Sequence, residues 1–268
     1  MAGIIKSYVL GMIICIQFFS SIPIKKEIPM TPKNLEKAIQ TFPILGCLQG
    51  LIYAGLLYGL LHWTVFSHLA IAFVIWLSII ILTGGIHLDG WIDCSDAFFS
   101  YRDREKRLEI MEDPRTGAFG VISVIVLLSA RFLFIYEIVS KAGELSYLLI
   151  FFIPFLSKML MGMTLAMIPL AKKEGLGYLF QQACQQKTLW MYPFYLAVVF
   201  IFQWLWLKEG IVIFSCMLLS IFVLFLLLRR KVVDWFGGIS GDVVGAATEG
   251  AECGLWMIVW LFHYYGMG

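Results

Sequence analysis

Long apolar runs separated by short polar connections make up most of this chain. Each run is close to the roughly 20 residues that a helix needs to cross the hydrocarbon core of a bilayer. The eight runs occupy residues 4–24, 40–62, 66–86, 118–138, 147–171, 189–207, 210–228 and 243–265. This pattern predicts an all-α, polytopic integral membrane protein with seven to eight membrane helices, forming a single domain over residues 1–268. The first run contains Gln17 and ends in a Ser-Ser-Ile-Pro turn, so it either spans the membrane or lies as an interfacial or re-entrant helix.

The composition supports the same fold class. Of the 268 residues, 60% are hydrophobic and 14% are charged, whereas soluble domains carry roughly 45–50% apolar and about 25% charged residues. A soluble enzyme, a disordered protein and a disulfide scaffold are therefore excluded. The six cysteines are scattered singly without CxxC or CxxH spacing, so neither a zinc site nor a disulfide framework is indicated.

Lysine and arginine residues are distributed unequally between alternate loops. Fifteen of them lie in the loops 25–37, 87–117, 172–188 and 229–242, and only Lys141 and Lys208 lie in the connections between these. By the positive-inside rule the rich loops face the cytoplasm. We therefore expect a multi-pass protein of the cell inner (cytoplasmic) membrane with its site on the cytoplasmic side.

The longest polar stretch, residues 83–120, carries eight acids in 38 residues. Asp89, Asp93 and Asp96 stand at i, i+4 and i+7, which places three carboxylates on one face of a helix. Such carboxylates repel one another unless a cation lies between them, and oxygen ligands favour magnesium or manganese over zinc. The three residues are candidate metal ligands. The alternative is a solvated acidic face neutralised by the basic residues of the same loop.

Other polar residues of this stretch have two interpretations each. Glu105, Glu109 and Glu112 repeat the same spacing, with Asp113 one turn beyond Glu109, and here a solvated charged surface is an equally good interpretation. His87 is either a base or metal ligand, or an ordinary hydrogen-bonding side chain at the membrane interface.

A second polar group begins with a glycine-rich turn at residues 237–245. A helix that starts near Asp242 would direct N–H groups towards an anion such as phosphate. Glu249 and Glu252 follow inside the last apolar run. Carboxylates at membrane depth are costly and are functional by default, so we expect both to face the protein interior near the Asp89–Asp96 face. Arg131 and Lys158, also in apolar runs, either pair with these acids or bind phosphate.

Two classes of protein fit these residues. One is a magnesium-dependent transferase that acts on phosphate-containing substrates at the membrane surface. The other is a cation- or proton-coupled transporter that uses the buried acids. Transporters usually carry inverted repeats with acids near the midplane. Here the acids cluster at one membrane face and no repeat is visible, which favours the enzyme.

Five ordered blocks, from about residue 18 to residue 252, resemble the adenosylcobinamide-GDP ribazoletransferase family, also called cobalamin synthase. The signature block is Thr83-Gly84-Gly85-Ile86-His87-Leu88-Asp89-Gly90, followed by Asp93 and Asp96. The other blocks are Phe42-Pro43-Ile44-Leu45-Gly46 with Gly50, Leu108-Glu109-Ile110-Met111 with Asp113, Arg115, Gly117 and Gly120, Glu174-Gly175-Leu176-Gly177, and Gly237-Gly238-Ile239-Ser240-Gly241-Asp242 through Gly245-Ala246-Ala247, Glu249 and Glu252.

The resemblance implies a phosphotransferase of the last nucleotide-loop assembly step in cobalamin biosynthesis. A hydroxyl of α-ribazole, or of its 5′-phosphate, attacks adenosylcobinamide-GDP; adenosylcobalamin or its phosphate forms, and GMP leaves. The implied cofactor is Mg²⁺, with Mn²⁺ as the alternative, held by Asp89, Asp93 and Asp96. The implied catalytic residues are Asp93, Asp96 and His87. The implied substrate- and phosphate-binding residues are Glu109, Asp113, Arg115, Lys158, Gly237, Gly238, Ser240, Gly241, Asp242, Glu249 and Glu252.

The implied partners are these two substrates, the lipid bilayer and other enzymes of cobalamin synthesis, with no nucleic acid. Three positions depart from the family pattern: Ala97 replaces a glycine, Pro114 a serine and Lys158 an arginine. The CDP-alcohol phosphatidyltransferases are the nearest alternative enzyme class, with a DGxxAR motif. The residues after Asp89-Gly90 are Trp-Ile-Asp-Cys, so the Ala-Arg pair is missing.

Overall fold

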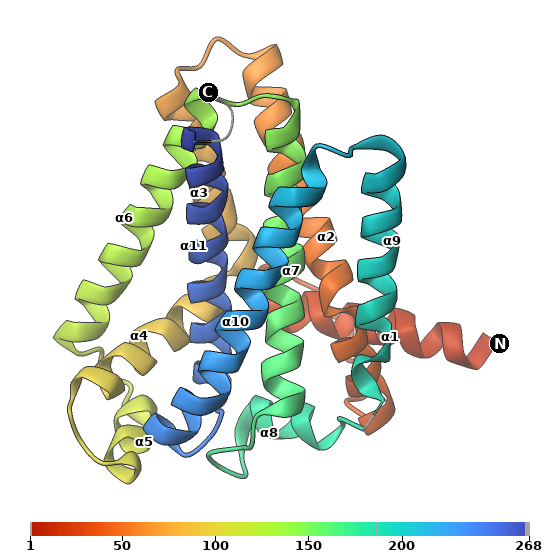
Figure 1. The fold of residues 1–268 in the computed structure, drawn as a ribbon. Coiled ribbons are helices and arrows are strands. Elements are labelled where there is room, and N and C mark those ends of the chain that lie inside the picture. The colour runs from red at the N-terminus through yellow and green to blue at the C-terminus, as the bar shows by residue number, and fades with distance from the viewer. Residues whose placement is uncertain (1, 186, 266–268) are drawn as a thin grey trace.

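The computed structural model describes residues 2–185 and 187–265, and almost all of this chain is helical (Figure 1). The helices are α1 (Ala2–Phe19), α2 (Pro32–Trp63), α3 (His68–Thr83), α4 (Ile86–Phe99), α5 (Arg104–Glu112), α6 (Ala118–Ser140), α7 (Glu144–Met167), α8 (Gly175–Gln182), the short 3-10 helix η1 (Thr188–Trp190), α9 (Met191–Trp206), α10 (Gly210–Phe236) and α11 (Gly241–Tyr265). No strand forms within the described residues; a single β-bridge joins Leu170 to Ile239.

All eight apolar runs form helices, and the prediction of an all-α polytopic membrane protein is confirmed. Five helical segments are long and apolar enough to cross a membrane: α2, α6, α7, η1 with α9, and α10. A sixth is obtained if α3 and α4 count as one broken span. This number is smaller than the seven to eight expected, since α1 offers only the short apolar stretch Ile5–Phe19 and α11 carries three acids.

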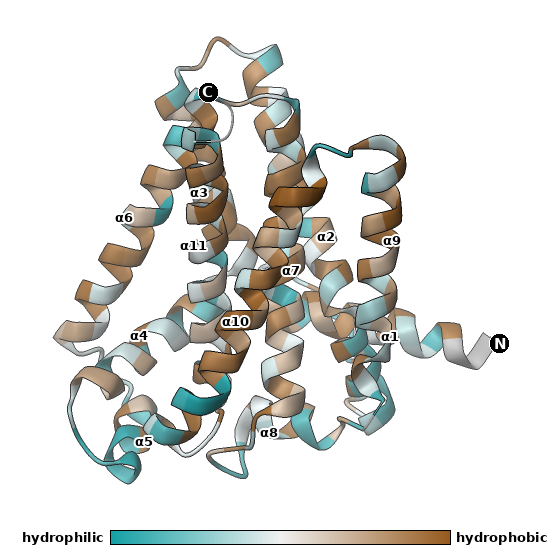
Figure 2. Ribbon diagram, in the orientation of Figure 1, coloured by the Kyte–Doolittle hydropathy of each residue, from teal (hydrophilic) through white to brown (hydrophobic). Residues whose placement is uncertain are grey.

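The long helices run roughly parallel, with α7 at the centre (Figure 1). Helix α7 is buried over most of its surface and packs against α2, α10 and α11. Apolar residues cover the outer faces of the bundle, whereas polar residues gather at its lower end in Figure 2. Helix α1 lies across the long helices near this end (Figure 1), as expected for an interfacial rather than a spanning segment.

The four loops rich in lysine and arginine meet at one end of the bundle. Figure 1 shows the segments before α2, around α5, around α8 and after α10 at the lower end, and the α2–α3, α6–α7 and α9–α10 connections at the upper end. The alternation of charge along the sequence therefore corresponds to an alternation of sides in the fold. This end is the one predicted to face the cytoplasm.

This topology predicts the outcome of cysteine labelling in intact cells. Single cysteines at Lys33, Arg104, Lys173 and Arg230, one in each basic loop, are expected to react only with a reagent that crosses the membrane. A cysteine at Lys141, in an opposite connection, is the matched control and should react with an impermeant reagent. Impermeant labelling at any of the four would contradict the arrangement.

A sharp bend between α3 and α4 brings the signature segment to the lower end. The axes of the two helices differ by 87°. Gly84 ends α3 and Gly85 precedes α4, with φ of 66° and 75°, a left-handed conformation that side chains with a Cβ rarely adopt. The backbone N–H of Ser21 donates to Leu82 O at 2.9 Å and holds the bend against the segment after α1. As a result α4 does not continue the α3 span but runs across the end of the bundle.

Candidate active site at the junction of α4 and α11

The N-terminus of α11 lies directly against α4, and the contact depends on a residue without a side chain. A Cβ at Gly90 would lie 2.6 Å from Asp242 O and 2.8 Å from Asp242 Cα. Because Gly90 lies next to Asp89 in the sequence, the close approach brings Asp242 to the acidic helix. Asp89 is exposed, and Asp93, Asp96 and Asp242 are half-buried.

Four carboxylates therefore share this junction, and Asp93 is the most strongly affected. Partial burial and then the negative charges of Asp89, Asp242 and Asp96 raise the pKa of Asp93 to about 7. Within the described residues, no ion pair neutralises Asp89, Asp93 or Asp242. The interpretation of this stretch as a solvated face neutralised by neighbouring arginines does not hold for these acids.

Asp96 differs from the other acids because both of its oxygens already have partners. Gly117 N donates to Oδ2 at 2.7 Å and Gly120 N donates to Oδ1 at 2.8 Å, so the carboxylate caps the N-terminus of α6. A Cβ at either glycine would overlap these oxygens. Asp96 thus links α4 to α6. If Asp96 also acts as a metal ligand or catalytic group, as predicted, it does so while its oxygens accept these two hydrogen bonds.

Replacing Asp96 by asparagine should therefore destabilise the protein. The amide keeps one acceptor oxygen but loses the charge that two backbone N–H groups and the helix dipole stabilise. Hydrogen bonds to charged groups contribute about 1.5–3 kcal/mol. We therefore expect the free energy of unfolding, measured in mixed micelles, to fall by this amount. Glu105→Gln, at an exposed acid of α5, is the control and should change stability by less than about 0.5 kcal/mol. Equal stabilities for the two variants would contradict the capping role.

The donor chemistry of the remaining three acids fits Mg²⁺ or Mn²⁺. No three His, Cys, Asp or Glu side chains in the described part of the chain are already arranged around one ion position. Mg²⁺ typically binds one or two carboxylates and completes its octahedron with water and substrate phosphates. Asp89, Asp93 and Asp242 supply carboxylates at the exposed end of the bundle, where such phosphates have access.

His87 occupies the side of α4 that packs into the bundle. Its ring stacks on Phe19 of α1, with centroids 5.7 Å apart and planes 16° apart, and Gly245 of α11 packs against its backbone. Burial, and then the charge of Lys158, hold the pKa of His87 well below its usual value, so the ring is neutral. Nε2 has no hydrogen-bond partner within the described residues. His87 therefore does not join the four acids.

The predicted binding residues of the 105–115 segment form local pairs at the surface. Glu109 pairs with Lys106, and the Arg115 guanidinium donates to Asp113 at 2.9 and 2.6 Å. These hydrogen bonds lower the pKa of Asp113 to about 2. The Arg115 side chain is 87% exposed. The structure thus favours a solvated charged surface here, and Arg115 is a strongly exposed cation of this segment even though it is paired with Asp113.

A second polar group lies deeper, between α6, α7 and α11. Arg131 donates to Glu249 Oε2 at 2.5 Å, and Ser157 donates to Glu252 Oε2 at 3.3 Å. Lys158 is fully buried within electrostatic range of both glutamates. These residues form what we call the buried charge cluster.

Glu249 and Glu252 are each 2% exposed, so their predicted inward orientation is confirmed. Their predicted proximity to the α4 acids stays a prediction. The negative charge of Asp242 acts on Asp93. The charges that act on Glu252 are instead those of Lys158, Arg131 and Glu249. Seven residues of helix separate Asp242 from Glu249, about 10 Å along the axis. The two groups are therefore successive layers along α11.

The glycine-rich turn before α11 is explained largely by packing. Gly237 ends α10 with φ 79°, and a Cβ at Gly238 would overlap the backbone of the 169–171 segment. The turn pairs with that segment, since Ile239 N donates to Pro169 O at 2.8 Å. Ser240 is buried and its Oγ accepts from Val243 N at 3.2 Å, which caps α11. Only Gly241, which is exposed, and Asp242 remain available at the junction.

Several residues that build the two layers were not singled out from the sequence. Gly90, Gly117 and Gly120 make room for Asp242 and Asp96, and Tyr53 and Ser157 border the buried charge cluster. The signal for the glycines was their place within the family blocks, which does not reveal what each one contacts. No local signal marks Tyr53 or Ser157, because both lie in apolar runs.

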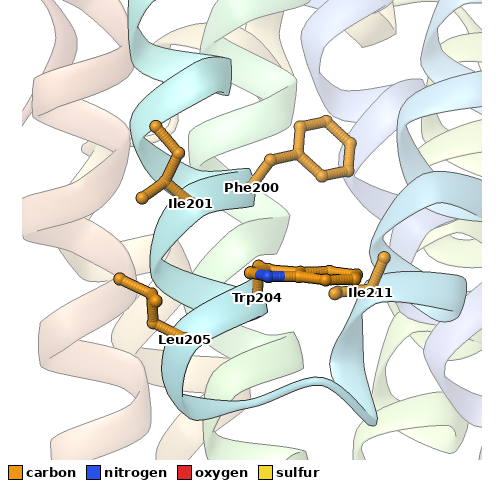
Figure 3. A pocket seen from close by; sticks show the side chains of 5 residues that line it. All are labelled: Phe200, Ile201, Trp204, Leu205 and Ile211. Atoms are coloured by element: carbon orange, nitrogen blue, oxygen red, sulfur yellow. The ribbon is translucent and has the colours of Figure 1, made fainter.

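A shallow pocket on α9 and α10 offers no chemistry. Figure 3 shows Phe200, Ile201, Trp204, Leu205 and Ile211 around it, and the only polar atom among their side chains is the indole nitrogen. Ile201, Trp204 and Leu205 are exposed on a helix long and apolar enough to span the membrane. This pocket belongs to the lipid-facing surface of the bundle.

Comparisons with known proteins agree on one family. The family model described as cobalamin-5-phosphate synthase matches residues 11–260. An adenosylcobinamide-GDP ribazoletransferase of Geobacillus thermodenitrificans is 36% identical over 96% of this chain and 98% of its own length. Proteins of the same name from Halalkalibacterium halodurans and Clostridioides difficile are 32% and 28% identical, over 94% of this chain and 95% and 96% of their own lengths. No solved structure matches this chain.

Proposed function

Because the chain belongs to the cobalamin-5-phosphate synthase family, we propose that the junction of α4 and α11 is where it carries out the family's reaction. The protein is a transferase of cobalamin nucleotide-loop assembly that joins adenosylcobinamide-GDP to α-ribazole or its 5′-phosphate, with release of GMP. The comparisons support neither a cation-coupled transporter nor a CDP-alcohol phosphatidyltransferase. The observation that carries the placement is the group of uncompensated carboxylates at the basic end of the bundle.

The reaction makes one P–O bond and breaks another. The ribazole hydroxyl oxygen attacks the phosphate next to the aminopropanol arm, the bond from this phosphate to GMP breaks, and the hydroxyl proton must be accepted. Phosphoryl transfer depends on positioning and charge stabilisation more than on covalent help from the protein. Among the acids of the junction, Asp93 is the candidate acceptor of that proton. Its pKa of about 7 applies to the junction without a bound cation.

Asp89, Asp93 and Asp242 would hold Mg²⁺, or alternatively Mn²⁺, at this junction. The bound cation supplies charge neutralisation to the pyrophosphate and the leaving GMP. Asp96 holds α4 against α6, and Gly90 allows Asp242 to approach, so both position the reacting carboxylates. Exposed Arg115 is the phosphate-binding candidate at the surface. The buried charge cluster holds α11 in place rather than contacting the phosphates.

The side of the membrane follows from charge. Fifteen basic loop residues share the end that carries the acids, which supports a site on the cytoplasmic face of the inner membrane. The diphosphate of adenosylcobinamide-GDP would reach the exposed Asp89 from this side. Association with other enzymes of cobalamin synthesis stays a prediction.

The assignment is tested with purified protein in detergent, given adenosylcobinamide-GDP and α-ribazole. We expect GMP and adenosylcobalamin in equal amounts with Mg²⁺, and at least about 10²-fold less in EDTA, the cost of losing a charge-stabilising group. Restoring Mg²⁺ or Mn²⁺ should recover the rate. No GMP release under any metal condition would overturn the proposed activity, and full activity in EDTA would overturn the metal assignment alone.

A further inference from the structure

A cavity of about 950 Å³ lies on the back of α4, away from the acids. Trp91, Cys94, Ser95 and Phe98 line it from α4, and helical geometry places them opposite Asp89 and Asp93. The other walls come from α6, α10 and α11. The volume is at the upper end of the range for ligand pockets, about 300–1,000 Å³. Since α4 separates the cavity from the carboxylates, the reacting phosphates do not occupy it.

The walls of the cavity are apolar and open towards the membrane. Ile122 and Val126 of α6 line it and are nevertheless 58% and 61% exposed. Helices α6 and α10, which form its two sides, are both long and apolar enough to span a bilayer. The opening between them therefore faces hydrocarbon, so a ligand would enter from the bilayer rather than from water.

Two cations lie at the aromatic end of this cavity. The Arg107 guanidinium carbon is 5.6 Å from the ring centroid of Phe98, and Lys231 Nζ is 6.0 Å from that of Trp235. Phe98 and Trp235 both line the cavity and pack 4.6 Å apart. Within the described residues neither cation forms an ion pair. The apolar cavity thus has a positive rim at the basic end of the bundle.

Two buried donor atoms at this site also lack partners in the described chain. They are Nε1 of Trp91, which lines the cavity, and Nε of Arg107 at the rim. Buried N–H groups are nearly always hydrogen-bonded in folded proteins. Both donors suit the ester and phosphate oxygens of a lipid, whereas a purely apolar occupant would leave them unsatisfied.

We propose that this cavity binds one anionic phospholipid, with an acyl chain between α6 and α10 and the phosphate at Arg107 and Lys231. The apolar walls and the opening between α6 and α10 match the acyl chains of such a lipid, and the cationic rim matches its anionic head group. The bound lipid fills the space behind α4 and supports the helix that carries Asp89 and Asp93. This site is separate from the one that binds the soluble substrates.

The proposal is tested by native mass spectrometry of delipidated full-length protein, with phosphatidylglycerol and phosphatidylcholine of identical acyl chains. We expect one phosphatidylglycerol to be retained in preference to phosphatidylcholine. A lysine near the membrane surface contributes about fivefold to the binding of an anionic lipid, so Lys231→Gln should weaken retention by about that factor. Neither Lys231 nor Arg230 lines the cavity itself, but Lys231 lies over the ring of Trp235, which does. Arg230→Gln, at the preceding residue of α10, is therefore the control and should bind as wild type does.

A second pair of variants tests the apolar part. Ala246 lines the cavity from α11, so Ala246→Phe should fill it and abolish preferential retention, while Met257→Phe, exposed elsewhere on α11, should not. If Ala246→Phe fails to fold, the Lys231 and Arg230 comparison still decides. Equal retention of the two lipids by wild type, equal behaviour of Lys231→Gln and Arg230→Gln, or displacement of the lipid by α-ribazole would each overturn the proposal.

Discussion

Asp93→Asn is expected to lower GMP release by about 10²–10³-fold, as loss of one charge-stabilising group in a transition state typically does. Asparagine keeps the shape of the side chain but can neither carry the negative charge nor accept the hydroxyl proton. The measurement is the initial rate of GMP formation by both proteins in the same detergent with saturating Mg²⁺. Glu105→Gln is the control, because that exposed acid of α5 lies outside the junction. Equal rates for wild type and Asp93→Asn would remove Asp93 from the site.

The same variant should fold at least as well as wild type. Burial and the neighbouring acids raise the pKa of Asp93 from 3.8 to about 7, so ionisation of Asp93 opposes folding in the metal-free protein. Stability is therefore lost as the pH rises from about 4 to about 7. Asp93→Asn removes this loss, and in EDTA at pH 8 its unfolding temperature should exceed that of wild type, with the difference shrinking at pH 5. A lower unfolding temperature at pH 8 would show that Asp93 has a structural role.

The largest expected effect on stability comes from Arg131→Met. The side chains of Arg131 and Glu249 are 1% and 3% exposed, and the substitution leaves the Glu249 charge without its partner. Breaking a buried pair in this way typically costs about 3–5 kcal/mol. The free energy of unfolding of both proteins, measured in mixed micelles, gives this cost. Lys172→Met, which breaks the partly exposed pair with Glu112, is the control and should cost at most about 1 kcal/mol.

The double variant Arg131→Met with Glu249→Met separates packing from charge. Replacing both members of a buried ion pair by apolar residues of similar size is often neutral, so the double variant should recover most of the stability that Arg131→Met loses. If the double variant is as unstable as the single one, the residues matter for their shape and not for their charges. If Arg131→Met costs less than about 1 kcal/mol, the buried charge cluster does not hold α11 in place.

The periodicity of the sequence was sufficient for the helices and for the acidic face of α4. Hydrophobic runs of spanning length have few alternatives to helices in a bilayer, and i, i+4, i+7 spacing places Asp89, Asp93 and Asp96 on one face whatever surrounds them. Charge alternation similarly identified the loops that share one end of the bundle. Helix formation, the acidic face of α4 and the side on which each loop lies all depend on residues close to one another in the sequence.

The partners of each side chain could not be predicted in the same way. Asp96 caps α6 through Gly117 and Gly120, and this contact depends on how α6 is placed after a loop of irregular structure. Asp242 and Glu249 share a face of α11, but two helical turns put them in different layers. The glycine-rich sequence around 237 and 238 suggested a phosphate-binding turn. In the structure, glycine is required at 237 by a positive φ and at 238 by close packing against the 169–171 segment.

Binding of Mn²⁺ in place of Mg²⁺ tests the central claim most directly, because the ion can be counted by electron paramagnetic resonance without any turnover. With adenosylcobinamide-GDP present, wild type should bind one Mn²⁺ per chain. The triple variant Asp89→Asn, Asp93→Asn, Asp242→Asn should bind none. The variant Glu105→Gln, Glu109→Gln, Glu112→Gln, which loses the same charge at exposed acids of α5, should bind as wild type does. Equal Mn²⁺ binding by the two triple variants would contradict a metal-dependent site at the junction of α4 and α11.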